Sequence, residues 1–244
     1  MQKMELDLPD LYKKEEKYLN LRHEEEAICW LWAYPTLLNW KTEIQWLYTP
    51  VVGNKRWPGD LWGIDKDGDL LIIECKQMKR NDDPFIDFVQ YHSDNREELS
   101  SRHWVEKFEK HYTAELKYDH VLDTRVKLKT DGIVPRSNKR TWLRTWKNVA
   151  ERIDNFIRSS AYKDRVNSFL NVREETGNRK PFYIGLLVQN KEQQQPLSDK
   201  AIDSRDQLIQ KVGLNNVLAY SIYGVRAQSD KVGIYCSRII HRSL

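Results

Sequence analysis

The stretch that decides the fold is residues 59–76, which reads GDLWGIDKDGDLLIIECK. Its KDG segment at 66–68 is typical of a three-residue hairpin loop, in which a type I turn is followed by a left-handed glycine. The apolar runs on both sides of this loop predict two antiparallel strands. The loop also fixes the register, because Asp65 then pairs with Asp69.

One face of this hairpin carries two acids and a lysine at its open end. The register places Asp60 directly opposite Glu74, with Cβ atoms about 4.5–5.5 Å apart. Alternate residues of a strand share a face, so Lys76 lies on the same face two residues beyond Glu74. The remaining members of this face are apolar: Trp62, Ile64, Leu70 and Ile72.

Two opposed carboxylates destabilise a sheet unless a positive charge neutralises them. Oxygen atoms from Asp60 and Glu74, with the backbone carbonyl of Cys75, suit a hard cation such as Mg²⁺ or Mn²⁺. Lys76 would then orient the attacking water and offset charge developing on a phosphorus centre. The pattern predicts phosphodiester hydrolysis. The register leaves one alternative open, an ion pair from Lys76 to Asp60 or Glu74 at the sheet edge.

The rest of the chain predicts one mixed α/β domain over residues 1–244. The expected order is helix, three strands, helix, a long basic and mostly helical segment, strand, helix, strand, strand. The helix that begins at Asp83 and Pro84 can extend past Leu99 toward Leu116. The other expected elements are helices over 18–32, 141–170 and 199–212 and strands over 42–48, 181–189, 217–225 and 232–240.

The positive charge is concentrated in the middle of the chain. The whole chain carries 40 Lys and Arg against 36 Asp and Glu, but residues 101–180 hold 19 Lys and Arg against 11 Asp and Glu. We interpret residues 101–180 as a basic, mostly helical insertion that would bind a polyanion; a solvated helix face is the alternative. The candidate nucleic-acid-binding residues are Lys127, Lys129, Arg136, Lys139, Arg140 and Arg144, together with Lys55, Arg56 and Trp57 before the hairpin.

Composition excludes several classes of protein. With 244 residues, of which 40% are hydrophobic, the chain can bury a core without disulfides or structural metals. No apolar run is long enough to span a membrane, and the first residues do not resemble a secretory signal. Cys29, Cys75 and Cys236 form no framework or zinc motif. A cytoplasmic location is expected.

The hairpin motif resembles the PD-(D/E)xK nuclease superfamily. The sequence PGD at 58–60 is followed, after an apolar strand, by ECK at 74–76. Residues 22–77 are also similar to NucS-like, RecB-like and Shedu-type nucleases, which share a helix with an early Glu and a P-x-L-L segment after it. The resemblance implies a restriction endonuclease-like αβββαβ core, with a mixed sheet flanked by helices, and Mg²⁺- or Mn²⁺-dependent cleavage of DNA by an endonuclease. Gly59 replaces the proline that precedes the aspartate in the family, which we expect to have little effect.

The resemblance also implies auxiliary residues. The superfamily often adds an acid from its first helix, and helical spacing from Leu21 and Ile28 places both Glu24 and Glu25 on the inward face; we prefer Glu25. RecB-like members place a glutamine after the metal-binding strand, where Gln90 and Gln77 compete. Asp94 stands where that motif would have a tyrosine.

Two other functions stay open on the residues alone. A nuclease-like scaffold could bind nucleic acid without cutting it, although an intact Asp, Glu and Lys set speaks against this. An RNA-directed nuclease is the second, because contacts to phosphates and metal do not separate ribose from deoxyribose. The oligomeric state is also open, with a homodimer as one arrangement.

Overall fold

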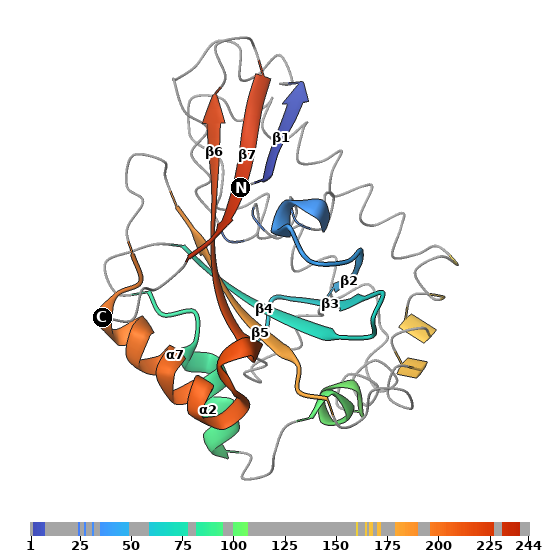
Figure 1. The fold of residues 1–244 in the computed structure, drawn as a ribbon, viewed down its shortest axis with the longest axis vertical. Coiled ribbons are helices and arrows are strands. Elements are labelled where there is room, and N and C mark those ends of the chain that lie inside the picture. Colours follow the sequence, from blue (N-terminus) through green and yellow to red (C-terminus); the bar gives the residue numbers. More distant parts are fainter. Residues whose placement is uncertain are drawn as a thin grey trace, which may run out of the picture.

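The fold is that of a computed structural model, drawn in Figure 1. The structure describes residues 2–7, 24, 27, 31, 35–48, 59–77, 82–94, 100–106, 160, 164, 166–167, 170–171, 179–189, 196–226 and 231–239. None of the helices in these ranges is long and apolar enough to span a membrane.

Within the described ranges, seven strands form one twisted sheet in the order β1-β7-β6-β5-β4-β3-β2. The three central strands β4, β5 and β6 are parallel, and the remaining neighbours are antiparallel. The predicted mixed α/β class is therefore confirmed. The strands are β1 Gln2–Asp7, β2 Ile44–Tyr48, β3 Leu61–Asp65, β4 Leu70–Gln77, β5 Phe182–Val188, β6 Val217–Arg226 and β7 Lys231–Arg238.

Two helices, α2 and α7, pack on each other beside the central strands (Figure 1). Ser198 begins α7 by accepting a hydrogen bond from the Ala201 N–H, and Gly213 ends it, as predicted. Residues 24, 27 and 31 are helical within the predicted first helix. The described helices and 3₁₀ turns are α2 Ile86–Asp94, α7 Asp199–Val212, η2 Pro35–Leu38 and η4 Leu214–Asn216.

The predicted long helix after Pro84 is wrong. The helix α2 ends at Asp94, and Ser100 is not helical. A separate helical segment occupies residues 101–106, and the Ser100 hydroxyl accepts a hydrogen bond from the His103 N–H at its start. Serine is a favoured N-cap residue, so a second helix begins here.

The strand β1 has no counterpart in the sequence analysis, which begins with a helix. It pairs with β7, near the other end of the chain, over the full length of β1, from Gln2↔Cys236 to Asp7↔Lys231. Of the predicted insertion, residues 101–106, 160, 164, 166–167 and 170–171 are helical, and most of the remainder lies outside the described residues.

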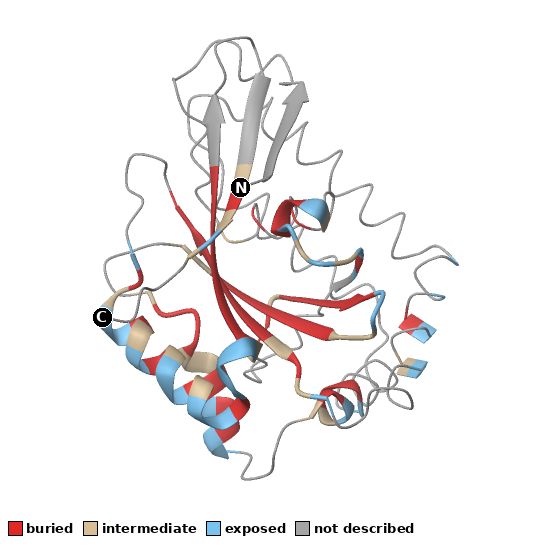
Figure 2. Ribbon diagram, in the orientation of Figure 1, coloured by how far each residue is buried: buried red, intermediate tan, exposed pale blue. Residues whose placement is uncertain are grey.

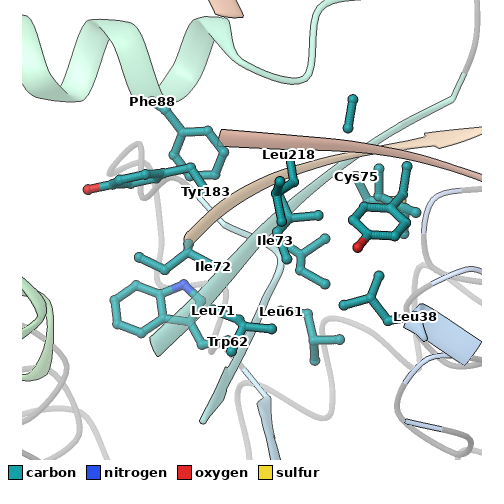
Figure 3. Close-up of a cluster of buried hydrophobic side chains, with 14 of the residues drawn as sticks. Leu38, Leu61, Trp62, Leu71, Ile72, Ile73, Cys75, Phe88, Tyr183 and Leu218 are labelled. Atoms are coloured by element: carbon teal, nitrogen blue, oxygen red, sulfur yellow. The ribbon is translucent and has the colours of Figure 1, made fainter. Parts of the chain in front are cut away.

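The central strands are buried on both faces (Figure 2). On one face, Phe88 of α2 contacts Tyr183 edge to face, with ring centroids 5.0 Å apart, and Ile72 lies beside Tyr183 in the register. On the other, Leu61 and Ile73 gather with Leu38 of η2 (Figure 3). Two apolar faces are expected for parallel strands covered on both sides.

A buried polar cluster joins α2 to the sheet. The Tyr183 hydroxyl accepts a hydrogen bond from Trp104 Nε1 at 2.9 Å and lies 2.9 Å from His92 Nε2. The direction of the bond between Tyr183 and His92 depends on the tautomer of the neutral imidazole, since the phenol oxygen can both donate and accept. Burial, followed by the charges of Lys211 and His103, lowers the pKa of His92 to about 4.

Acid is therefore expected to destabilise the fold through His92. Its pKa in the folded state lies below the ordinary 6.5, so the stability it contributes is lost as pH falls from about 6.5 toward about 4. Between pH 7 and 4.5 the wild type should lose about 2 kcal/mol more unfolding free energy than His92→Gln, which cannot take up that proton. Urea unfolding at both pH values measures this difference. Parallel losses in the two proteins would contradict it.

Candidate active site

The hairpin has the predicted register. The pairs Trp62↔Ile72 and Ile64↔Leu70 face each other across β3 and β4. Gly68 has φ 80° and donates its N–H to the Asp65 carbonyl at 3.0 Å, as the predicted turn requires. Local turn chemistry therefore determines where the residues at the open end of the hairpin lie.

At that open end, Asp60 and Glu74 meet. The Asp60 N–H donates to the Ile73 carbonyl at 2.6 Å, and Asp60 Oδ2 accepts the Cys75 N–H at 2.8 Å. The Asp60 carboxylate thus continues the hydrogen bonding of β4 just beyond the end of β3. Glu74 is 5% exposed, whereas Asp60 is half-buried, so the pair lies where the core reaches the surface.

Gly59 contributes directly, contrary to the expectation that its replacement of proline has little effect. Its N–H donates to Glu74 Oε2 at 2.8 Å, and its φ is 100°. Proline has no N–H and a φ near −65°, so it could supply neither feature. The glycine that precedes Asp60 therefore also orients the Glu74 side chain.

The Lys76 ammonium lies between two carboxylates. It forms an ion pair with Glu74 Oε1 and a second with Asp87 Oδ2 of α2, at 3.2 Å. The alternative left open by the sequence, an ion pair between Lys76 and an acid at this edge, is thus present. Asp87 is absent from the sequence-based candidates; an acid in the first turn of the next helix is its only local signal.

The site is rich in acids. Burial, and then repulsion from Asp60, raises the pKa of Glu74 to about 8, because the ion pair with Lys76 does not fully offset them. For Lys76, burial alone would lower the pKa, but attraction to Glu74 and Asp87 outweighs it and raises the pKa. The lysine is therefore a cation at neutral pH, and the nearby acids Glu74, Asp87 and Asp60 favour its charge.

Glu24 approaches the same end of β4 from the first helix. Its Oε1 accepts the Gln77 N–H at 2.7 Å, and its carbonyl lies 3.7 Å from the Cys75 sulfur. Cys75 is fully buried, as expected for a small apolar side chain, and burial raises the pKa of its thiol. Gln77 takes part through its backbone, while Gln90 is exposed on α2.

The remaining candidates lie outside the described residues, so their roles stay predictions. These are Glu25, Lys55, Arg56, Trp57, Lys127, Lys129, Arg136, Lys139, Arg140 and Arg144.

The donor set fits a hard divalent cation. Asp60 and Glu74 offer carboxylate oxygens from neighbouring strands, and Mg²⁺ usually binds one or two carboxylates while keeping several waters. Within the described part of the chain, no group of three or more His, Cys, Asp or Glu side chains is arranged as a metal site. Burial and then repulsion from Asp60 raise the pKa of Glu74, and a cation bound beside both acids would favour the charged form of Glu74.

Comparisons with known proteins add no relatives. No protein-family model, no curated protein and no solved structure matches this chain. The resemblance to the PD-(D/E)xK superfamily therefore rests on the sequence motif.

Neutralising Asp60 is expected to stabilise the metal-free protein. Folded Glu74 keeps its proton up to about pH 8, so the stability that this group contributes is lost as pH rises from about 4.5 through about 8. Asp60→Asn removes the repulsion and can still accept the Cys75 N–H, so unfolding free energy at pH 8 should rise by about 0.5–1.5 kcal/mol. Urea unfolding in EDTA measures this change. A loss of stability would contradict the repulsion that we infer.

Proposed function

We propose that this chain is a metal-dependent nuclease that hydrolyses phosphodiester bonds of DNA as an endonuclease. The observation that carries the proposal is the convergence of Asp60 and Glu74 across the hairpin, with the Lys76 ammonium bound to Glu74. These are the three residues of the PD-(D/E)xK pattern. The Lys76 side chain is 26% exposed, so solvent reaches it.

The order of elements around the site supports the proposal. Helical residues 24, 27 and 31 precede the β2–β3–β4 meander, which is followed by α2 and by β5 parallel to β4. The resemblance implies this same αβββαβ order for a restriction endonuclease-like core. The strand β4, which carries Glu74 and Lys76, is one of the three central strands of the sheet (Figure 1).

Each side chain has a distinct task in this proposal. When bound, Mg²⁺ would activate the attacking water and neutralise charge on the phosphate. Asp60 and Glu74 would hold the cation, and Glu24 fixes the end of β4 through the Gln77 N–H. Lys76 keeps its proton, so it would donate hydrogen bonds and stabilise charge instead of acting as a base. The basic insertion would bind phosphates of the substrate.

The experiment is incubation of the purified chain with plasmid, linear duplex, single-stranded DNA and RNA, in Mg²⁺, Mn²⁺ or EDTA. We expect metal-dependent nicking or linearisation of the plasmid, and none in EDTA. Retarded DNA that is never cut in either metal would instead support a binding scaffold. Cleavage restricted to RNA would support the RNA-directed nuclease. The Lys76→Ala variant, run in parallel, excludes a contaminating nuclease.

A further inference from the structure

Asp87 holds the outer side of the Lys76 ammonium. The two ion-pair partners of Lys76 come from different elements, since Glu74 belongs to β4 and Asp87 to α2. Their burial also differs: the side chain of Glu74 is 6% exposed, but that of Asp87 is 34% exposed. The ammonium therefore lies between an inner carboxylate that belongs to the cation site and an outer one that does not.

The position of Asp87 is fixed by the start of α2. Asp83 accepts the Phe85 N–H at 2.8 Å and a hydrogen bond from the Ser204 hydroxyl of α7. Gly185, which pairs with Glu74 in the register, allows this turn to approach the sheet: a Cβ there would lie 2.6 Å from the Phe85 ring. The first turn of α2, which contains Asp87, is thus held against the strand beside Glu74.

A cation at Asp60 and Glu74 would compete with the ammonium for Glu74. Both bind the same carboxylate, and like charges a few ångströms apart repel strongly in a partly buried site. If Glu74 were its only partner, the long and flexible lysine side chain would then turn to solvent. The contact with Asp87 is independent of Glu74 and would persist.

We propose that Asp87 is the positioning residue for Lys76, which keeps the ammonium beside the site when a divalent cation occupies Asp60 and Glu74. This inference rests on the proposed function. Asp87 acts through the lysine, and its carboxylate serves two ends: it reduces competition between ammonium and cation for Glu74, and it keeps Lys76 within reach of the phosphate.

The first test measures binding of Mn²⁺ alone by calorimetry. Asp87→Asn should weaken Mn²⁺ binding about tenfold, because Glu74 becomes the sole partner of the ammonium. In a Lys76→Met background the same change should weaken it only about two- to threefold, through loss of a distant charge. Asp199→Asn is the matched control, since Asp199 is an exposed acid in the first turn of another helix, α7. Equal losses with and without Lys76 would overturn the inference.

The second test measures cleavage at saturating metal. Asp87→Asn should lower kcat about 10–100-fold, because the lysine loses its orientation. KM should change little, because the surface that binds DNA is unchanged. Asp87→Glu should recover part of this loss, and Asp199→Asn should show none. In a Lys76→Ala background Asp87→Asn should have no further effect.

The outcomes separate this inference from the proposed function. If the wild type cleaves DNA but Asp87→Asn behaves like Asp199→Asn in both tests, the role of Asp87 is refuted and the nuclease proposal stands. If no protein cleaves any substrate but the Mn²⁺ measurements depend on Lys76 as described, the nuclease proposal fails and the role of Asp87 in the cation site is supported.

Discussion

Replacing Lys76 with alanine is expected to slow Mg²⁺-dependent DNA cleavage about 10²–10³-fold, the usual effect of removing one group that stabilises developing charge. Lys76 is the cation that lies beside Glu74, and attraction to Glu74 and Asp87 keeps it protonated despite burial. The loss should appear in kcat, measured at saturating DNA, because the group would act on the reacting phosphate. Plasmid cleavage time courses measure it.

Two further variants make the Lys76 result interpretable. Asp60→Asn should abolish cleavage and also abolish the thermal stabilisation that Mg²⁺ gives the wild type, since it removes one cation ligand. Lys200→Ala removes an exposed lysine from the first turn of α7 and should leave kcat unchanged. Circular dichroism would show that all three variants remain folded. Undiminished cleavage in both Asp60→Asn and Lys76→Ala would reject the assignment.

The geometry of the hairpin was predictable because its determinants are local. The glycine at 68 specifies the turn, and the turn specifies the register from Ile64↔Leu70 to Leu61↔Ile73, which leads to Asp60 and Glu74 just beyond. Each step uses neighbours within one short stretch of chain. Residue types alone were therefore enough to predict the register that leads to the two acids.

The missed features depend on contacts between distant elements. Asp87 reaches Lys76 because Asp83 and Ser204 fix the start of α2, and Ser204 lies far along the chain on α7. The strand β1 pairs with β7 from the opposite end of the sequence. Local patterns say nothing of such pairings, since tertiary packing decides them.

The choice among the helix-1 acids illustrates the same limit. Helical spacing places Glu24 and Glu25 equally well on the inward face, so it could not distinguish them. The contact of Glu24 with the Gln77 N–H depends on where the end of β4 meets the helix. A register between a helix and a strand is a tertiary property and has no periodic signal in either segment.

The largest loss of stability is expected from Gly59→Ala. Gly59 has φ 100°, and a Cβ there would lie 2.5 Å from Ile72 Cγ2 and 2.6 Å from Trp62 Nε1. Backbone strain and overpacking each cost about 1–3 kcal/mol, so the unfolding free energy should fall by about 3–5 kcal/mol. Urea unfolding measures it. Relief of the clash would move the 59–60 backbone, so the variant should also cleave DNA more slowly.

Gly213→Ala is the matched control for this loss. Gly213 has nearly the same φ, 102°, but the nearest atom to a Cβ there is Asn216 Oδ1 at 3.8 Å. It should therefore show the backbone strain without the clash, a loss of about 1–2 kcal/mol, with unchanged cleavage. Equal losses of unfolding free energy in the two variants would mean that the side chains of Ile72 and Trp62 can move aside at little cost. Their tight packing against Gly59 would then not be what positions Asp60.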